Sequence, residues 1–376
     1  MFRKRILITG GAGFIGSHVT DDLLTHGHEV RVLDSIAPRV HGGQRPSYLN
    51  PGAELLVGDI RDGAVVERAL EGIDVVFHLA AAVSVGESLY EVERCTSVNN
   101  VGTAVLMDRL ARTSVERLIL ASSSGVYGEG LYRSGSGALV EIARRTPDQL
   151  RRGDWEPRAD GHVLVPVATP ETKLVSPGGV YARSKFDQER MCMRFGRAFG
   201  ISTLVLRLFN VFGTRQSSVT PYSGYLSRWA SRILDDGRPL VFEDGGQLRD
   251  FVHVKDVAAA FRSSLEANVA SGVFNVGSGT PRTLASVAQK IAEILGRPEL
   301  VPESTERYQM GEVRHCYANI TRAESLLGYR PTVEFDAGLG ELVAAIAAEP
   351  RRTKSPAKTA HPENPTSTTI AIGGAP

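Results

Sequence analysis

The sequence has no excess of charge of either sign and no long apolar run. Its 376 residues include 43 Lys and Arg against 42 Asp and Glu, so the charge balance argues against nucleic acid as the main ligand. No apolar stretch reaches the roughly 18 residues that a membrane span needs. The apolar stretch behind the basic N-terminus is broken at once by Thr9-Gly10-Gly11, so we expect no signal peptide, no membrane partner and a cytoplasmic protein.

Cysteine is also scarce. Cys95, Cys192 and Cys316 lie far apart in the sequence and show no metal-ligand spacing, which predicts small buried side chains in a reducing compartment. The nine histidines show no such spacing either, and we expect His78 to be packed at a strand end. The sequence therefore predicts no metal site. With 42% hydrophobic residues, the chain is long enough for two domains with a sizeable core.

Short apolar runs alternate with amphipathic stretches in the first half of the chain. Helices are expected at 14–26 and 62–70, and strands at 6–8, 30–33, 54–57, 74–77 and 117–120. Strands that alternate with helices form crossover units, so we predict an α/β fold with a parallel sheet.

The pattern fails between 129 and 175, which we interpret as a surface insertion and possible lid with one short helix in 138–150. Its paired arginines are expected to be solvated, although closure over a ligand is an alternative. Regular structure resumes with a helix at 180–199 and a strand at 203–208. Further helices are expected near 226–235, 254–267 and 284–295. Residues 349–376 show no periodicity and predict a disordered tail.

A glycine-rich loop follows the first strand and opens the first helix. Gly10, Gly13 and Gly16 allow a tight turn, a close approach of the backbone to a pyrophosphate, and close packing of helix on strand. Asp34 ends the second expected strand, where its carboxylate would bind the ribose hydroxyls and repel a 2′-phosphate. The loop therefore predicts a Rossmann-type doubly wound sheet that binds NAD rather than NADP.

A tyrosine and a lysine lie one helical turn apart. In Tyr181-Ala182-Arg183-Ser184-Lys185 the two side chains share a helix face, and we expect the ammonium to lower the phenol's pKa so that the phenolate can act as a base. The serines Ser122, Ser123 and Ser124 end a parallel strand, where open α/β sheets build their sites. A hydroxyl there can bind a substrate oxygen, although a polar strand-end turn is the alternative.

Together these features resemble the extended short-chain dehydrogenase/reductase family, in its NAD-dependent nucleotide-sugar epimerase/dehydratase branch. Further motifs of that family follow in order: Gly58-Asp59-Ile60, His78-Leu79-Ala80-Ala81, Asn99 to Thr103, Arg207 to Gly213, Gln247 to Val254 and Asn275-Val276-Gly277. The resemblance implies a Rossmann domain from 1–128 and 176–212 and a smaller mixed α/β substrate domain from 213–348. Parts near 248–276 would return to the Rossmann domain.

The resemblance also implies roles for individual residues. Ser123, Tyr181 and Lys185 would be catalytic. Ser124, Asn210, Arg249 and Arg314 would contact the substrate, with Arg307 as an alternative to Arg314. The residues expected to contact NAD are Gly10, Gly13, Phe14, Ile15, Gly16, Asp34, Asp59, Ile60, Leu79, Ala80, Ala81, Asn99, Ser122, Tyr181 and Lys185. A homodimer through the helix after Asn99 and the helix of Lys185 is expected as in many relatives.

Two departures bear on the choice of reaction within the family. Ser123-Ser124-Gly125 contains no carboxylate, whereas 4,6-dehydratases have an acidic pair here, so dehydration is not expected. Gln309 stands where many relatives have a phosphate-binding arginine. The overall pattern favours a nucleotide-sugar 4-epimerase, with dTDP-L-rhamnose as the candidate substrate and UDP-glucose or UDP-glucuronate as alternatives.

Two other functions compete with epimerisation. A one-way oxidoreductase or decarboxylase on the same fold would consume or release the cofactor, or lose CO2. A non-catalytic NAD-sensing protein would have no need of Ser123, Tyr181 and Lys185 together, so their presence argues against it.

Overall fold

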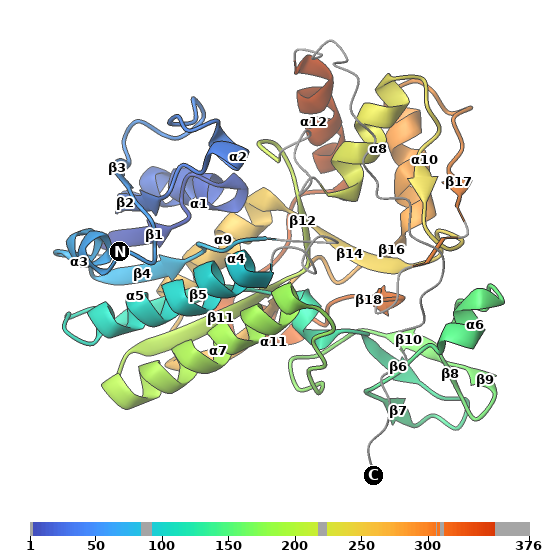
Figure 1. Ribbon diagram of the computed structural model, residues 1–376, viewed down its shortest axis with the longest axis horizontal. Helices are drawn as coiled ribbons and strands as arrows, with labels where there is room; N and C mark the ends of the chain where they lie inside the picture. Colours follow the sequence, from blue (N-terminus) through green and yellow to red (C-terminus); the bar gives the residue numbers. More distant parts are fainter. Residues whose placement is uncertain (1–2, 84–91, 217–223, 306, 309–311, 350–376) are drawn as a thin grey trace.

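The computed structural model describes residues 3–83, 92–216, 224–305, 307–308 and 312–349. The expected tail, apart from Glu349, and Gln309 therefore lie outside the described residues. The chain folds into a large α/β layer structure, with a smaller unit and a lobe beside it (Figure 1). None of the described helices combines the length and the apolarity needed to cross a membrane.

The large unit is built on one sheet of seven parallel strands. The strand order is β15-β11-β5-β4-β1-β2-β3, and every neighbouring pair is parallel. The strands are β1 (Arg5–Thr9), β2 (Glu29–Asp34), β3 (Glu54–Val57), β4 (Val75–His78), β5 (Arg117–Ser123), β11 (Ser202–Leu208) and β15 (Ser271–Val276). Strand order reverses between β1 and β4, which is where such sheets bind ligands. The predicted Rossmann-type fold is confirmed.

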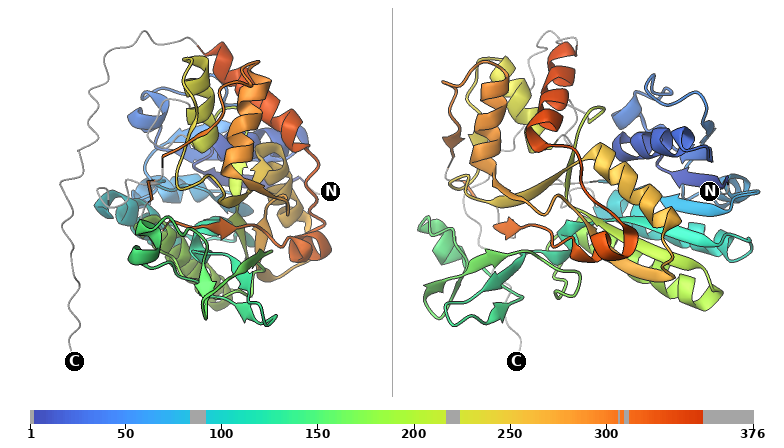
Figure 2. Two further views of the ribbon diagram at one scale, coloured as in Figure 1. Left: turned by 90° about the vertical axis from the view of Figure 1, so that its right-hand side faces the viewer. Right: turned by 180° about the vertical axis from the view of Figure 1, so that it is seen from behind.

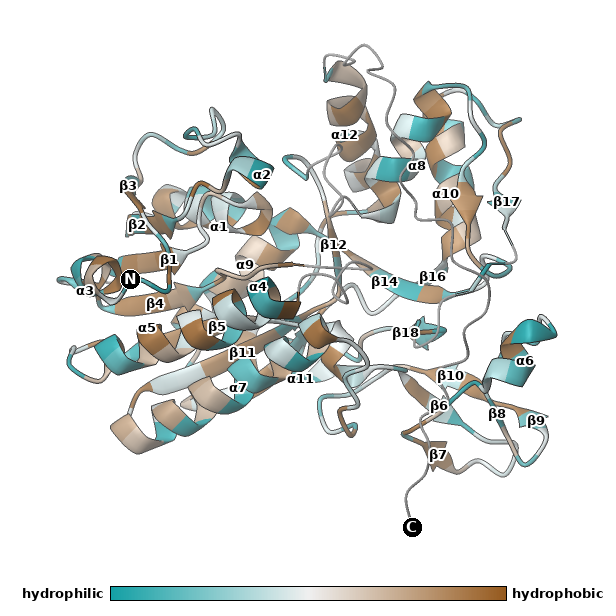
Figure 3. Cartoon of the chain, viewed as in Figure 1, coloured by the Kyte–Doolittle hydropathy of each residue, from teal (hydrophilic) through white to brown (hydrophobic). Residues whose placement is uncertain are grey.

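Helices cover both faces of this sheet, as Figure 2 shows from two sides. One face carries α1 (Phe14–Thr25), α9 (Val254–Glu266) and α11 (Thr321–Leu327), and the other carries α3 (Gly63–Leu70), α5 (Gly102–Leu110) and α7 (Val180–Phe199). Two short helices, α2 (Pro38–His41) and α4 (Val92–Thr96), complete this unit. The central strands are the most apolar part of the chain (Figure 3) because both of their faces are covered.

Side chains alternate along each strand, so each face of the sheet has its own hydrophobic core. Phe77 of β4 points toward α9, where its ring centroid lies 5.4 Å from that of Phe261. Its neighbour Val76 belongs to the opposite core, together with Leu106 of α5. Burying one such side chain contributes about 1.5–3 kcal/mol, so the two cores hold the sheet rigid beneath the candidate site.

The smaller unit combines a mixed sheet with three helices. Its strands are β12 (Asn210–Phe212), β14 (Leu248–His253), β16 (Pro281–Thr283) and β18 (His315–Cys316), and its helices are α8 (Tyr225–Leu234), α10 (Leu284–Ile294) and α12 (Phe335–Ala348). A two-stranded pair, β13 (Leu240–Val241) with β17 (Glu303–Ser304), lies at its edge. β14 belongs to this smaller unit. The chain then returns to the large unit, where α9 packs on one face of the sheet and β15 is one of its strands.

Residues 129–175 form a folded lobe. Three antiparallel strands, β6 (Leu131–Arg133), β7 (Leu139–Val140) and β10 (Val165–Val167), pack with α6 (Pro147–Arg151) and the hairpin of β8 (Arg158–Ala159) and β9 (His162–Val163). A single helix across 138–150 was wrong, because Leu139 and Val140 pair with β6 and the helix begins only at Pro147. The proline supplies the fixed φ of a first helical turn, and the Thr146 hydroxyl caps it.

Candidate active site

The glycine loop makes a turn that tolerates no side chain at two of its positions. Gly10 has a φ of +72°, and a Cβ there would lie 2.8 Å from the backbone nitrogen of Ala80. A Cβ on Gly16 would lie 2.3 Å from the carbonyl oxygen of Gly10. The turn leads into α1, which begins at Phe14 and has no side-chain cap on its first N–H groups. Such a helix start favours an anionic group.

Asp34 lies directly beside this loop. Its carboxylate accepts hydrogen bonds from the backbone N–H of Ala12 at 3.1 Å and of Ile36 at 2.9 Å. His41 Nε2 approaches the same carboxylate at 3.9 Å. The end of β2 is therefore fixed next to the turn, in the arrangement that ribose recognition needs.

The ends of β3 and β4 continue the same edge of the sheet. Asp59 accepts hydrogen bonds from the backbone and guanidinium of Arg61, which hold the pKa of its carboxyl below the usual range. Ile60 packs so closely on α5 that a Cβ at Gly102 would lie 2.5 Å from it. After β4, Leu79, Ala80 and Ala81 are half-buried, and the Ala80 N–H donates to Thr9 Oγ1 at 3.2 Å.

His78 is a buried structural residue, as predicted. Its Nδ1 lies 2.7 Å from Thr9 Oγ1, and its Nε2 lies 2.8 Å from Thr103 Oγ1. Burial lowers the pKa of His78 to about 3, so its ring is neutral at physiological pH. Among the described residues no cluster of His, Cys, Asp or Glu could hold a metal ion.

Asn99 connects the segment after β4 to the start of α7. It lies in a π-helical turn, Ser97–Val101, and is fully buried. Its Oδ1 accepts from the Ala82 N–H at 2.7 Å, while its Nδ2 donates to the Ala82 carbonyl at 3.1 Å and to Ser184 Oγ at 2.9 Å. Because Ser184 precedes Lys185, this contact fixes the start of α7 against the sheet edge.

Tyr181 and Ser123 come together at the junction of α7 and β5. Burial raises the pKa of Tyr181 to about 12, and a hydrogen bond with the Ser123 side chain opposes this rise. The expected lowering of the Tyr181 pKa by Lys185 was wrong for this structure. The physical reason is that an enclosed phenol loses the solvation that its anion needs, and this effect dominates.

Lys185 is a buried residue of the same helix. Its side chain is 2% exposed, and burial lowers its pKa to about 8, with Glu189 one turn further along acting in the opposite direction. Burial of an ammonium is costly, so this position suits a group that meets the hydroxyls of a bound ligand.

Ser122 does not share the position of Ser123. Adjacent strand residues point to opposite faces, and the Ser122 hydroxyl donates to Glu189 Oε1 at 2.5 Å. Arg207 of β11 binds both oxygens of the same carboxylate, at 3.0 and 2.8 Å. The prediction that Ser122 contacts the cofactor therefore does not hold for its hydroxyl. Sequence reasoning missed Glu189, whose one-turn spacing from Lys185 was the available signal.

The predicted substrate residues separate into two groups. Asn210 opens β12 immediately after β11, and Ser124 follows Ser123, and both are half-buried. Arg249 on β14 is buried, and both of its terminal nitrogens donate to protein acceptors. One binds the Glu312 carboxylate at 3.1 Å and the carbonyl oxygen of Val313 at 2.6 Å, and the other binds the carbonyl oxygens of Leu248 and Arg314, both at 3.0 Å. Ser124 and Asn210 thus lie near the ends of β5 and β11, and Arg249 lies on β14.

Arg314 lies elsewhere, and its predicted contact with the substrate was wrong. Its guanidinium is 2% exposed and is bound by the carboxylates of Glu156, Glu243 and Asp244 at 2.6 to 3.0 Å. Three carboxylates around one guanidinium leave it no donor for a diphosphate. Arg145 was expected to be solvated, but it is likewise buried, with Glu243 at 2.6 Å.

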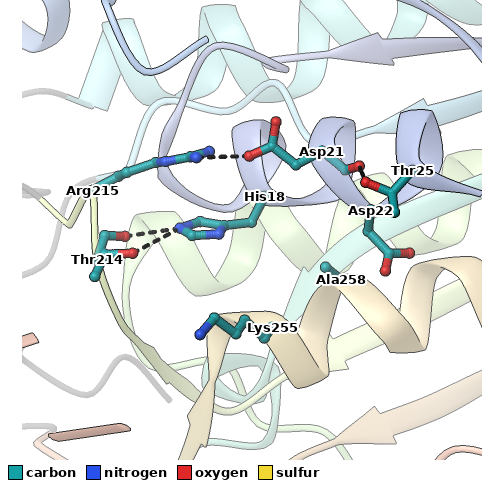
Figure 4. A pocket seen from close by; sticks show the side chains of 8 residues that line it. All are labelled: His18, Asp21, Asp22, Thr25, Thr214, Arg215, Lys255 and Ala258. Carbon is teal, nitrogen blue, oxygen red and sulfur yellow. Dashed lines mark hydrogen bonds and ion pairs between the residues drawn. The ribbon is translucent and has the colours of Figure 1, made fainter. Parts of the chain in front are cut away.

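A separate pocket of about 400 Å³ lies between α1 and α9. Figure 4 shows His18 beside Thr214, with the ring Nε2 3.0 Å from the Thr214 carbonyl oxygen, and Arg215 paired with Asp21 at 2.7 Å. None of the predicted catalytic side chains lines it. This pocket is therefore distinct from the grouping of Ser123, Tyr181 and Lys185.

Comparison with known proteins decides the family. The sequence profile of the NAD dependent epimerase/dehydratase family matches residues 6–147 and 159–277. The chain belongs to this family. It is 33% identical to a dTDP-L-rhamnose 4-epimerase of Burkholderia thailandensis, over 92% of this chain and 96% of that protein.

Solved structures agree with this family assignment. The Thermotoga maritima UDP-glucose 4-epimerase with UDP-glucose is 30% identical, with a TM-score of 0.75 over 91% of this chain and 98% of that one. The Bacillus cereus UDP-glucuronic acid 4-epimerase, in complex with UDP-glucuronic acid and NAD, is 26% identical, with a TM-score of 0.75 over 91% and 99%.

The residues of this epimerase-family chain fit the family's cofactor. The glycine loop leaves no Cβ in the turn, and the start of α1 has no side-chain cap. Lys185, which is 2% exposed, carries an ammonium on the same helix as Tyr181. The site therefore offers an anion-binding helix start at one end and a cation for hydroxyl groups at the other.

Proposed function

We propose that this protein is a nucleotide-sugar 4-epimerase that acts by transient oxidation of the sugar at C4, with dTDP-L-rhamnose as the first candidate substrate. The grouping of Tyr181 with Ser123 and Lys185 at the carboxyl end of β5 carries the proposal. The similarity to a dTDP-L-rhamnose 4-epimerase over nearly the whole chain supports the choice of sugar.

Tyr181 is proposed to remove the proton from the C4 hydroxyl and to return it after the sugar has presented its other face. Bound NAD supplies the two-electron acceptor and donor for this exchange. Because burial holds the Tyr181 pKa at about 12, the phenol needs help to give up its proton. Ser123 is placed to supply it, since a hydroxyl that donates a hydrogen bond to the phenolate favours the charged form.

Lys185 is proposed to hold the ribose hydroxyls next to the nicotinamide. It would also add positive charge one helical turn from Tyr181. Asp34 would bind the adenosine ribose, and the N–H groups at Phe14 and Ile15 would bind the diphosphate. Asp59, Ile60, Leu79, Ala80 and Ala81 would enclose the adenine and the sheet edge beneath it. Asn99 would act by fixing the backbone of Ala82 and the hydroxyl of Ser184.

The reaction requires the keto sugar to turn within the pocket, so the sugar ring cannot be held tightly. The substrate must then be anchored through its nucleotide diphosphate. Asn210 and Arg249 are the proposed anchors. Arg249 already pairs with Glu312 and its terminal nitrogens all have acceptors, so it would bind the diphosphate by exchanging its bond to the partly exposed Glu312 carboxylate for one to a phosphate oxygen.

We also propose that two copies pair through α5 and α7 in a reducing, cytoplasmic compartment. Val101, which precedes α5, and Phe199, at the end of α7, are apolar side chains that are 50% and 55% exposed, and a dimer interface would cover them. All three cysteines are buried thiols, which suits a reducing compartment.

The substrate is tested by proton NMR of the purified protein with dTDP-L-rhamnose, UDP-glucose and UDP-glucuronate, one at a time and without added cofactor. The expected result is a new C4 epimer of dTDP-L-rhamnose that grows to a fixed ratio, because the cofactor is regenerated in each turnover. Epimerisation of a UDP-sugar instead would replace the proposed substrate. Release of CO2, or stoichiometric consumption of added NAD, would overturn the epimerase proposal in favour of a one-way reaction.

A further inference from the structure

A buried ionic cluster joins the lobe at 129–175 to the smaller unit. At its centre is Glu243, which is 1% exposed and is shared by two arginines from distant parts of the chain. Arg145 of the lobe binds one carboxylate oxygen at 2.6 Å, and Arg314, just before β18, binds the other at 3.0 Å. Each buried charge therefore has a partner, which is the condition under which such charges persist in a protein interior.

Further bonds make the connection between the two parts rigid. Glu129 and Glu156 of the lobe both bind residues at the start of β18. Glu129 accepts the backbone N–H of Arg314 at 2.7 Å and of His315 at 3.2 Å. Glu156 lies 2.8 Å from His315 Nε2 and binds the Arg314 guanidinium at 2.6 Å. The lobe is thus fastened to the segment that carries β18.

Arg145 extends this cluster toward the proposed substrate anchor. Its second terminal nitrogen donates to the carbonyl oxygen of Glu312 at 2.7 Å. The Glu312 carboxylate in turn accepts from Arg249 at 3.1 Å and from the Tyr225 hydroxyl at 3.2 Å. The guanidinium fork of Arg145 therefore holds Glu243 with one arm and the backbone behind the Arg249 pair with the other.

We propose that Arg145 is a positioning residue, through which the lobe fixes Glu312 and Arg249 for the nucleotide diphosphate of the substrate. The inference rests on the proposed function for its substrate class. Arg145 itself is buried behind this pair, with a side chain that is 3% exposed, and acts through Glu312. A lysine cannot replace it, because a single ammonium lacks the planar fork that reaches two acceptors at fixed spacing.

The test is Arg145→Lys, with Arg145→Gln as a second variant that leaves Glu243 paired with Arg314 if the lysine disturbs folding. We expect the Kd of dTDP or UDP, measured by calorimetry, to rise about 10-fold or more, because small displacements of an anchoring group are costly. KM for the sugar nucleotide should rise in parallel, while kcat and the content of bound NAD change little. Arg152→Lys, an exposed arginine in the same lobe, is the matched control and should change neither constant.

An unchanged nucleotide Kd in both variants would overturn the inference, even if the melting temperature fell, because that is the signature of a purely structural role. A fall in kcat at constant KM would also overturn it. Nucleotide binding is measured without turnover, so it separates the two proposals. A wild-type protein that binds dTDP or UDP but epimerises no sugar contradicts the proposed function alone, whereas one that binds neither contradicts this inference.

Discussion

Replacing Tyr181 by Phe is expected to lower kcat by about 10³-fold or more while bound NAD is retained, since a positioned acid–base group contributes about 10² to 10⁴-fold. Phenylalanine keeps the ring at the junction of α7 and β5 but removes the hydroxyl that is proposed to exchange a proton with the sugar. The fold should be unaffected, because no hydrogen bond of the Tyr181 hydroxyl is needed to satisfy a buried backbone group.

The measurement is turnover by NMR together with the NAD content of the purified variant. Tyr317→Phe is the matched control, since the Tyr317 hydroxyl donates to the Pro166 carbonyl oxygen in the lobe at 3.4 Å and is not part of the proposed site. Turnover of Tyr181→Phe within a few-fold of the wild type would remove Tyr181 from the mechanism.

Gly16→Ala is expected to abolish NAD binding, with the Kd raised about 100-fold or more. The added Cβ would lie 2.3 Å from the Gly10 carbonyl oxygen and 2.7 Å from the Gly11 Cα, both backbone atoms of the turn. The start of α1 must then move away from β1, and a 1 Å displacement of a binding element can cost about 10²-fold. The N–H groups at the helix start would then no longer converge on the cofactor's diphosphate.

Gly340→Ala is the control for this substitution, because a Cβ on Gly340 in α12 meets nothing within 4 Å. It should bind NAD normally and gain stability, since alanine is the better helix former by about 1 kcal/mol. NAD titration by fluorescence, with circular dichroism as the check on folding, distinguishes the two. Normal NAD affinity in folded Gly16→Ala would show that the glycine loop is not the cofactor site.

The parts of the fold that follow from local patterns could be predicted from the sequence. Six strands of the large sheet, all except β15, are short apolar runs that the sequence predicted, and the helix at Val180–Phe199 agrees with its predicted bounds. The glycine loop could be recognised because its spacing reflects a steric requirement within a few residues. The helix-face spacing of Tyr181 and Lys185 was readable in the same way, whereas the choice of Ser123 among the strand-end serines came from the resemblance to the family.

What could not be predicted depends on contacts between distant residues. From the sequence, Arg145 was expected to be solvated and Arg314 to contact the substrate, and only the fold brings both to Glu243. The Tyr181 pKa was misjudged for a related reason, since the sequence gives the spacing to Lys185 but not the extent of burial. Ser122 was assigned to the site by adjacency, although neighbouring strand residues face opposite sides.

The fate of the C4 hydrogen shows whether this enzyme oxidises its sugar transiently at C4. Nucleotide sugar carrying deuterium at C4 is incubated with the protein in ordinary water, and the product epimer is examined by NMR and mass spectrometry. Transient oxidation requires the epimer to keep its deuterium at C4, because the same atom is removed and returned within one closed site. Replacement of the deuterium by solvent hydrogen would show that C4 is deprotonated instead, and would rule out transient oxidation.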